Sequence, residues 1–406
     1  MNAGMEAVRN FDPAHLDAAF LGNPYPTYHL LREFDPVHRC ADGSYFLTRY
    51  DDVAAIYRDR RFSSDKKVEF RPKFGDSWLY VHHTTSLVFN DPPLHTRVRR
   101  LIMGALTPRA LAALEPQLVA LVDRLLDRAA ERGTMDLIED FAAAIPIEVI
   151  GDLLGVPRAD RGPLRGWSLA ILGALEPVIT EEQRTRGNNA VAEFRDYLIG
   201  LVAERRRNMR DPEQDVLSRL IAGEADGEKL TEEELLQNCI FLLNAGHETT
   251  TNLIGNGVAA LIDNPGELRR LREDPGLIKS AVEEFLRYES SNQLGNRITV
   301  EEVEIGGVTM PPGTRVTLCI GAANRDPAQF PDPDRLDITR HPNRHLAFGG
   351  GIHACAGMSL ARMEGQIAIL RLVQRFAEIA PNGPFVRGGR ARFRGFASYP
   401  LAVKAG

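Results

Sequence analysis

Cysteine is scarce in this chain of 406 residues. The four cysteines are scattered, and no two of them form a Cys-x-x-Cys pair. This spacing argues against a disulfide framework, a zinc site and an iron–sulfur cluster, because all three need paired or clustered cysteines. Cys40, Cys239 and Cys319 are expected to be small buried apolar side chains. Cys355 differs from them in the residues that surround it.

Long apolar runs and a large surplus of one charge are also missing. No stretch reaches the ~18 apolar residues of a membrane span. Residues 1–10 lack the cationic start and apolar run of a targeting segment. A formal net charge of −6 argues against a general nucleic-acid binder. We therefore expect a soluble, cytoplasmic protein with no membrane or nucleic-acid partner, and its 44% of apolar residues can build a large core.

A glycine-rich loop surrounds the fourth cysteine. The run Phe348-Gly-Gly-Gly-Ile-His-Ala-Cys355-Ala-Gly357 stands directly before an apolar helical segment, Met358 to Phe376. Clustered glycines let backbone pass a large flat group that a Cβ would strike. The positive end of a helix dipole and its unpaired N–H groups favour a thiolate. The loop predicts a cysteine that binds haem iron as axial ligand; the alternative is a glycine-rich turn with a buried structural cysteine.

This loop resembles the haem-binding loop of the cytochrome P-450 family. Phe348, Gly351, Cys355 and Gly357 match its pattern Phe-x-x-Gly-x-x-x-Cys-x-Gly, and further motifs follow in the family's order along nearly the whole chain. The resemblance is to the soluble bacterial type. It implies a mainly α fold with a minor β portion, in which a triangular prism of helices surrounds a buried haem beside a long distal helix. It also implies one domain over residues 1–406, with β-rich portions near 35–50, 296–320 and 380–406 and a helical core near 91–290 and 358–376.

The distal helix is predicted to begin at Thr231 and to end near Ile262. Thr231 and Glu234 form a capping box, in which each side chain satisfies the other's backbone N–H. Apolar residues surround most of the helix, so it should be buried.

An unusual motif, Ala245-Gly-His-Glu-Thr249, interrupts this helix. A mid-helix glycine and a buried acid are locally unfavourable, which indicates a site. The motif resembles the family's (Ala/Gly)-Gly-x-(Asp/Glu)-Thr. Gly246 would let a diatomic ligand approach the backbone, Thr249 would hydrogen-bond it, and Glu248 would relay protons. The alternative is a kink with the threonine bonded to the preceding turn. His247 is expected to be packed or linked to solvent rather than a sixth iron ligand.

Basic residues are expected to bind the two haem propionates. His95 and Arg99 lie at i and i+4 on one helix face and resemble the family's His-x-x-x-Arg. Arg297 and His353 match the other propionate-binding positions, whereas Arg97 and Arg100 are expected to be solvated. The resemblance thus implies haem b as cofactor, Cys355 as metal ligand and this cofactor-binding set: His95, Arg99, Ala245, Arg297, Phe348, Gly349, His353, Cys355 and Gly357.

A second charged pair is expected to be structural. Glu284 and Arg287 lie at i and i+3 on one helix face and resemble the family's Glu-x-x-Arg. The resemblance implies a buried pair that is tied to the meander at Asn324 to Arg344, through Arg340 or His341.

The predicted activity is that of a haem-thiolate monooxygenase, which activates O2 and inserts one oxygen atom into a small organic substrate by hydroxylation or O-dealkylation. Glu248, Thr249 and Gly246 are the predicted catalytic residues. A peroxide-driven peroxygenase and a haem-based gas sensor or carrier are the alternatives.

The electrons must come from another protein. The chain has no flavin motif, cluster-type cysteine spacing or dinucleotide fingerprint. We therefore expect a monomer served by a separate ferredoxin and NAD(P)H-dependent reductase. A basic patch would suit an acidic partner, formed by Arg99, Arg100, Arg109, Arg344 and Arg362.

The substrate itself is not predicted. The segment Phe62 to Asn90 is expected to be irregular and to cover the distal pocket, and Leu169 to Ile179 to form a mobile lid. Many relatives carry proline where this chain has Asn292, which adds polarity near the substrate side together with Gln293 and Asn296. Other candidates to contact substrate are Arg71, Lys73, Trp78, Tyr80, His82, His83, Phe393 and Phe396.

Overall fold

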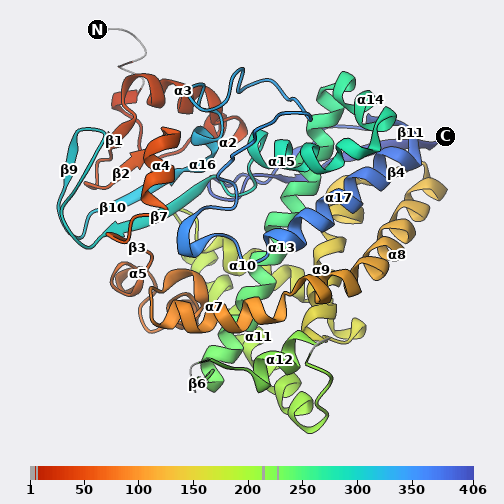
Figure 1. Ribbon diagram of the computed structural model, residues 1–406, viewed down its shortest axis with the longest axis horizontal. Helices are drawn as coiled ribbons and strands as arrows, with labels where there is room; N and C mark the ends of the chain where they lie inside the picture. Colours follow the sequence, from red (N-terminus) through yellow and green to blue (C-terminus); the bar gives the residue numbers. More distant parts are fainter. Residues whose placement is uncertain (1–4, 6–7, 213–214, 226–227) are drawn as a thin grey trace.

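Helices make up most of the computed structural model, which describes residues 5, 8–212, 215–225 and 228–406. Figure 1 shows a roughly triangular outline, with a small sheet at the upper left beside the N-terminus. This is the predicted mainly α fold with a minor β portion. The α-helices are α2 (Ala18–Gly22), α3 (Tyr25–Phe34), α4 (Tyr50–Ile56), α5 (Lys67–Phe74), α6 (Trp78–Thr85), α7 (Leu94–Ala105), α8 (Pro108–Arg132), α9 (Ala144–Leu154), α10 (Leu164–Gly173), α11 (Glu181–Arg207), α12 (Val216–Ala222), α13 (Glu232–Asp263), α14 (Pro265–Glu273), α15 (Ile278–Tyr288), α16 (Ile320–Ala323) and α17 (Met358–Arg375).

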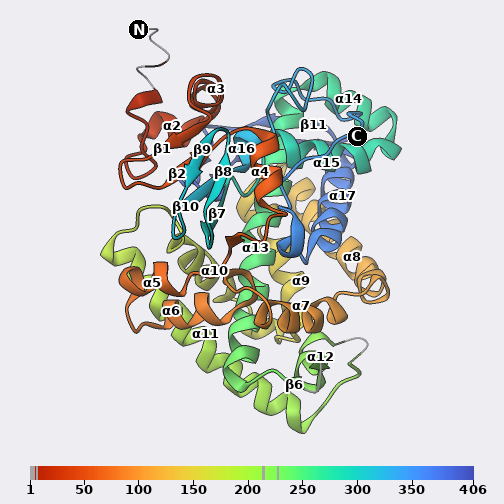
Figure 2. The same ribbon diagram turned by 60° about the vertical axis from the view of Figure 1, so that its left-hand side comes forward.

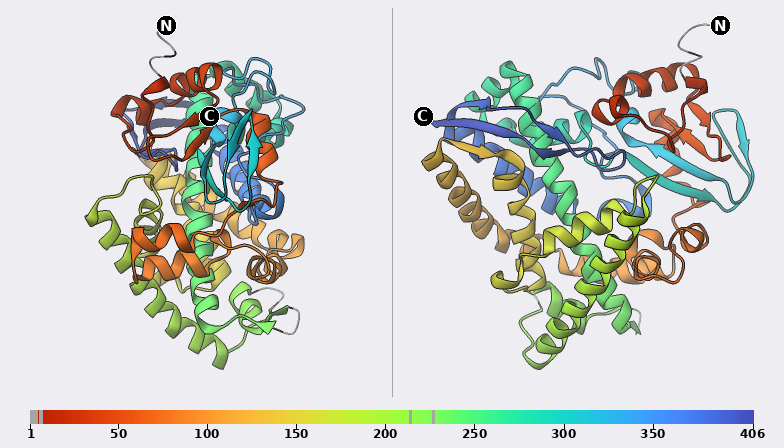
Figure 3. Two further views of the ribbon diagram at one scale, coloured as in Figure 1. Left: turned by 90° about the vertical axis from the view of Figure 1, so that its left-hand side faces the viewer. Right: turned by 180° about the vertical axis from the view of Figure 1, so that it is seen from behind.

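The long helix α13 is the axis of the molecule. It has 32 residues, and in the left panel of Figure 3 it runs through the height of the chain. The predicted capping box closes its N-terminus: the Glu234 N–H donates to Thr231 Oγ1 at 3.2 Å, and the Thr231 N–H donates to the Glu234 carboxylate at 2.8 Å. Because α9, α10 and α17 pack against it, most of its circumference is buried, as its apolar composition predicts.

The β portion consists mainly of two small sheets. The larger has the order β1-β2-β10-β7-β3, in which β10 pairs parallel with β2 and the other neighbours are antiparallel. Figure 2 shows α4 beside this sheet, onto which it packs through Val53 and Ile56. The second sheet, β11-β14-β4, joins the C-terminal strand to the segment after α8. The strands are β1 (Val37–Arg39), β2 (Tyr45–Leu47), β3 (Phe62–Ser63), β4 (Thr134–Asp136), β5 (Glu224–Ala225), β6 (Glu228–Lys229), β7 (Leu294–Thr299), β8 (Val303–Ile305), β9 (Val308–Met310), β10 (Arg315–Cys319), β11 (Phe376–Pro381), β12 (Val386–Arg387), β13 (Phe396–Ser398) and β14 (Pro400–Ala405).

The prediction of an irregular segment from Phe62 to Asn90 is wrong. Helices α5 and α6 occupy much of it, and Ser77 caps α6 by accepting a backbone N–H. A cluster of rings holds the two helices together, since the Phe70 ring lies 5.2 Å from that of Phe74 and 5.6 Å from that of His83. Tertiary packing therefore stabilises these short helices where the sequence shows no helical period.

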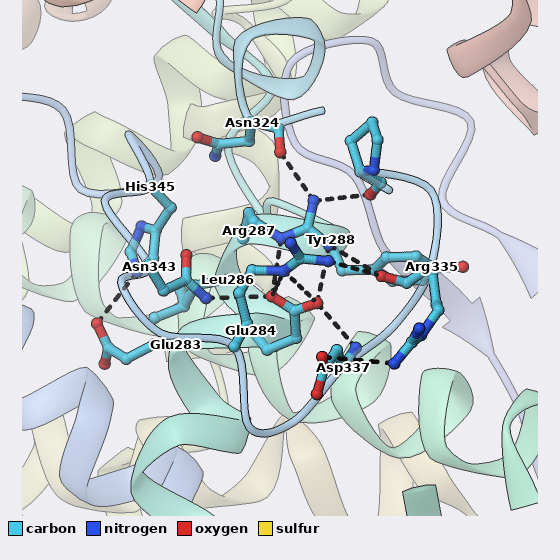
Figure 4. A network of polar contacts seen from close by, with 12 residues as sticks. Glu283, Glu284, Leu286, Arg287, Tyr288, Asn324, Arg335, Asp337, Asn343 and His345 are labelled. Carbon is cyan, nitrogen blue, oxygen red and sulfur yellow. Dashed lines mark hydrogen bonds and ion pairs between the residues drawn. The ribbon is translucent and has the colours of Figure 1, made fainter. Parts of the chain in front are cut away.

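A buried ion pair ties α15 to the meander. Arg287 donates to both carboxylate oxygens of Glu284, at 2.7 and 2.8 Å, and neither side chain is exposed. Figure 4 shows the same carboxylate accepting the Asp337 N–H, at 2.9 Å. Arg340 reaches it at 3.2 Å, which confirms one of the two predicted meander partners, whereas His341 is exposed to solvent. The contacts cross between segments far apart in the chain, so the pair holds the region behind the cysteine loop.

The other cysteines are structural, as expected. Cys40, Cys239 and Cys319 are buried, and none is in a disulfide. Within the residue ranges given above, no helix has both the length and the apolar character to cross a bilayer.

Candidate active site

The loop before α17 places Cys355 at the entrance of the helix. Gly351 has a φ of +63°, and a Cβ at this residue would lie 2.0 Å from the carbonyl oxygen of Tyr57. Both the backbone angle and the contact therefore require glycine. The Cys355 N–H donates to the Phe348 carbonyl at 2.9 Å and closes the loop. At Gly351 the need for glycine thus comes from close packing against the end of α4, a reason that the sequence does not reveal.

Opposing influences act on the Cys355 thiol. Burial raises its pKa, whereas the Gly357 N–H and the guanidinium groups of Arg99 and Arg362 lower it. The helix end favours the thiolate as predicted, but burial outweighs it and the net shift in pKa is upward. A cation bound to the sulfur would offset this cost, since thiolate is the ligand form of cysteine.

The cysteine opens into an internal cavity of about 330 Å³. Residues of α13 form part of its wall, and much of the surface is apolar, with Leu87, Phe241 and Leu172 among the lining side chains. Of the predicted catalytic and cofactor-binding residues, Glu248 alone is not part of the lining. The others that line it are His95, Arg99, Ala245, Gly246, Thr249, Arg297, Phe348, Gly349, His353, Cys355 and Gly357.

Basic side chains gather at one rim of this cavity. The rings of His95 and His353 lie 4.1 Å apart. Both nitrogens of His95 and Nε2 of His353 are buried without a hydrogen-bond partner, and His353 Nε2 is 3.9 Å from Asp91. Burial, with the nearby charges of His353, Arg99 and Arg297, lowers the pKa of His95 to about 4. Buried donors without partners are rare in proteins, so the rim is built to receive an acceptor group.

Within α13, Gly246 and Thr249 contact different neighbours. A Cβ on Gly246 would lie 2.7 Å from Cδ1 of Ile150, so the glycine allows α9 to pack against α13. Thr249 Oγ1 donates to the Ala245 carbonyl at 2.7 Å. The bond to the preceding turn that the sequence offered as an alternative is therefore present. It uses only the hydroxyl proton and leaves the oxygen's lone pairs free to accept.

These residues fit a haem. The single thiol lies on one side of the cavity, the unpartnered basic groups at the rim suit two propionates, and the apolar walls suit a flat hydrophobic ring. Thr249 of α13 lines the same cavity as the thiol.

Comparisons with known proteins agree with this arrangement. The family model described as "Cytochrome P450" matches residues 169–383, which is more than half of the chain. The chain belongs to the cytochrome P-450 family. It is accordingly a cytochrome P-450 monooxygenase, an oxidoreductase whose cofactor is a haem bound through cysteine thiolate.

Three relatives show how far the likeness extends. The vitamin D(3) 25-hydroxylase of Pseudonocardia autotrophica is 42% identical over 89% of this chain and 88% of its own length. The biotin biosynthesis cytochrome P-450 of Bacillus subtilis is 40% identical over 89% of this chain and 91% of its own. Among solved structures, P450BioI in complex with an acyl carrier protein carrying hexadec-9Z-enoic acid has a TM-score of 0.90. It is 38% identical, and the match covers 95% of this chain and all of that one.

In this P-450, Glu248 lies behind the cavity wall and is paired with Arg390. Two guanidinium contacts join them at 2.5 and 2.7 Å, and the same guanidinium donates to the Leu169 carbonyl. Burial raises the pKa of Glu248 to about 7, and Arg390 opposes this rise. Sequence reasoning missed Arg390, because it stands in a loop 142 residues further along the chain and belongs to no motif.

His247 is packed, as predicted. Its Nδ1 lies 3.1 Å from Ser168 Oγ, and burial lowers its pKa to about 3. The prediction that Arg97 is solvated is wrong, because this side chain is an ion-pair partner of Glu234, at 2.5 Å, and is only 17% exposed. The same carboxylate caps α13, so the arginine supports the helix end.

The residues predicted to contact substrate divide into two groups. His82, His83, Asn292, Asn296 and Phe393 line the cavity. The rest make other contacts that the sequence could not reveal. Arg195 lies over the Trp78 ring, and Arg71 lies over the Tyr80 ring and pairs with Asp76. Lys73 donates to the Glu176 carbonyl, Gln293 donates to the Ser290 carbonyl, and Phe396 packs on Phe385 and Tyr399.

The structure also differs from the expectations for the lid at Leu169 to Ile179 and for the basic patch. The predicted lid, Leu169 to Ile179, begins inside α10, which ends at Gly173 and thus contains its first five residues. Arg362 of the predicted basic patch pairs with Glu283 at 2.7 Å, so its charge is largely compensated. Arg109 and Arg344 are exposed.

Proposed function

We propose that this P-450 binds haem b with Cys355 Sγ as axial ligand and uses it to hydroxylate or O-dealkylate a small organic substrate. The observation that carries the proposal is the placement of one partly buried thiol in a cavity whose rim holds two histidines with unpartnered nitrogens. When bound, the haem supplies O2 activation, and thiolate donation favours O–O cleavage. The protein contributes binding, orientation and protons.

His95, Arg99, Arg297 and His353 would hold the two propionates. The buried nitrogens of His95 and His353 would then gain the hydrogen-bond partners that the protein alone does not provide. Phe348, Gly349, Ala245 and Gly357 contribute to the walls around the ring.

Proton supply is assigned to Glu248 and Thr249. One oxygen atom of O2 enters a C–H bond of the substrate and the other leaves as water, which consumes two electrons and two protons. A carboxyl whose pKa is near 7 can both take up and release a proton at neutral pH. The Thr249 hydroxyl lines the cavity and, with its proton on the Ala245 carbonyl, presents an acceptor oxygen there. Gly246 lets α13 stay close to α9 at this point.

Apolar side chains would position the substrate and exclude water. A vitamin D(3) 25-hydroxylase and a P-450 in complex with an acyl carrier protein carrying hexadec-9Z-enoic acid are both relatives, so hydrophobic substrates of moderate size suit the same fold. We also propose that the whole chain acts as one monomeric domain and that a separate ferredoxin with its NAD(P)H-dependent reductase delivers the electrons.

The test is the Soret band of the reduced, carbon-monoxide-bound protein. Thiolate ligation gives a band at much longer wavelength than histidine ligation does. We expect this band in the wild type and its loss in Cys355→Ser. Cys239→Ser, which alters a buried cysteine of α13, should keep it. A globin-like band in the wild type contradicts the proposal, and turnover with hydrogen peroxide but not with reduced ferredoxin would favour a peroxygenase.

A further inference from the structure

The cavity also carries polar atoms that no haem propionate would satisfy. Oδ1 of Asn244 and Nε2 of His83 are buried without a partner on the side formed by α13 and α6. Asn244 is 3% exposed and directly precedes Ala245 in the motif of the distal helix. An unsatisfied buried acceptor is costly, so an acceptor at this point of an apolar cavity points to a ligand group.

A chain of hydrogen bonds determines which end of the Asn244 amide faces the cavity. Glu233 is ionised and paired with Arg195, so it can only accept, and Gln237 donates Nε2 to it at 2.6 Å. Gln237 Oε1 must then accept from His82 Nδ1, 2.9 Å away. Burial lowers the pKa of His82 to about 4, so its ring is neutral and its Nε2 is an acceptor.

The last link in the chain is Asn244 itself. Its Nδ2 lies 3.3 Å from His82 Nε2 and donates to it. The other end of the amide, Oδ1, is thereby left as an acceptor without a partner, on a residue that lines the cavity. Reversing the amide would place two acceptors against each other, so the network fixes the orientation of this side chain.

We propose that Asn244 is a specificity-determining residue that accepts a hydrogen bond from a hydroxyl or N–H group of a neutral substrate. The inference rests on the proposed function and narrows its substrate class to molecules with such a donor beside an otherwise apolar body. A site built to pair with a hydroxyl discriminates strongly against the analogue that lacks it, because its own polar group is then left unpaired.

The cations of the cavity argue against a free carboxylate as the substrate's polar group. Among the described lining residues these are Arg99, Arg297 and Arg392. The first two belong to the propionate rim. Arg392 donates to the Leu175 and Leu294 carbonyls at 3.0 and 2.9 Å and also to Asn296 Oδ1. Its guanidinium is thus engaged on every nitrogen, and a carboxylate would meet no free cation away from the rim.

Binding of matched probes to the haem-loaded protein tests the inference. Vitamin D(3) and testosterone each carry one hydroxyl, and each would be titrated beside its deoxy analogue and its methyl ether, with the Soret shift as readout. We expect at least one alcohol to bind about ten-fold more tightly than both of its analogues. Hexadec-9-enoic acid, as a free carboxylate, should bind more weakly than that alcohol.

Variants then assign the preference to one side chain. Asn244→Leu should abolish the preference for the alcohol, whereas Asn244→Gln, whose amide still offers a donor for His82 and an acceptor for the substrate, should retain it. Phe241→Leu removes apolar contact from the same wall and should weaken alcohol, deoxy and ether forms alike. The inference is overturned if no alcohol binds more tightly than its analogues, or if the preference survives in Asn244→Leu. A normal thiolate Soret band alongside either result would leave the proposed function intact, whereas loss of that band in the wild type would count against the function itself.

Discussion

Glu248 shows how a single residue combines burial and charge. Its carboxyl is screened from solvent, which raises its pKa to about 7, and Glu176 acts in the same direction. Arg390 and Arg165 act in the opposite direction. The balance places the ionisation in the range where a proton relay operates well, so a change in any of these charges should move it.

Arg390→Leu is expected to shift the pH dependence of coupling, meaning product formed per NAD(P)H consumed. As pH rises through the pKa of Glu248, the carboxyl loses its proton and the coupling should fall. Without the opposing charge of Arg390 that pKa rises further, so the fall should occur about one pH unit or more higher than in the wild type. Measuring coupling from about pH 5.5 to about pH 9.5 checks this, because the range extends roughly 1.5 units below the wild-type midpoint and roughly 1.5 units above that expected for the variant.

Glu248→Gln provides the control, because it removes the titrating group and should give low coupling with no transition over this range. A midpoint that stays in place or moves downward in Arg390→Leu would mean that the ion pair does not set the proton affinity of Glu248.

Residues in short motifs were predictable, and their distant partners were not. Cys355, Thr249 and the basic residues of the rim follow from local spacing, and the structure brings them to one cavity. Arg390 and the Glu234 partner of Arg97 depend on how remote segments meet. Local sequence patterns do not predict contacts between such distant segments. The sequence also could not weigh burial against the helix end at Cys355, since burial is a property of the folded chain.

At the scale of elements, the pair Glu284 and Arg287 links α15 to the meander. Both side chains are fully buried, and the arginine also donates to the carbonyls of Asn324 and Pro333, at 2.9 and 2.7 Å. Removing one member of such a pair leaves a buried charge without its counter-charge, which is far more costly than losing an exposed pair.

Arg287→Leu should therefore destabilise the protein by roughly 3–5 kcal/mol and lower haem occupancy, because the meander leads into the cysteine loop. Thermal unfolding of the purified protein, together with its haem content, measures both effects. Arg206→Leu is the matched control, since Arg206 pairs with Glu232 at a half-exposed site and its loss should cost less than about 1 kcal/mol. Equal losses of unfolding free energy in the two variants would show that the buried pair stabilises the protein no more than an exposed pair does.

A helix could be predicted where its own sequence carries the features that stabilise it, and not where contacts between segments stabilise it. α13 was found to within about a residue because a capping box and a continuous apolar surface mark it locally. α5 and α6 were missed because rings from both helices and from Phe89 stabilise them together. Their own sequences, which include Pro72 within α5, show little helical pattern.

At the scale of the whole molecule, the buried cavity beside α13 and the exposed surface beside the cysteine loop have different roles. Its middle faces the cavity, and the helices that pack around it keep solvent away from the proposed reaction site. The cysteine loop also lines the cavity and follows directly after the meander, where Arg344 is exposed. Electrons from a protein partner have their shortest route to a thiolate-bound haem from the side of this loop, so charge on that side should control docking.

The net charge of the chain is −6, so an acidic ferredoxin would be repelled by the molecule as a whole and would depend on local arginines for binding. We expect the rate of haem reduction by reduced ferredoxin to fall steeply between low and physiological ionic strength, as the Debye length shortens from about 30 to about 8 Å. Arg344→Glu should slow reduction at low salt by about ten-fold or more and flatten the salt dependence.

Arg186→Glu, which alters an exposed arginine on α11, makes the same charge change elsewhere and should leave the rate near that of the wild type. Stopped-flow reduction under carbon monoxide separates the cases: equal slowing by both variants would indicate a net-charge effect, and a rate insensitive to salt would remove the basic docking surface from the account.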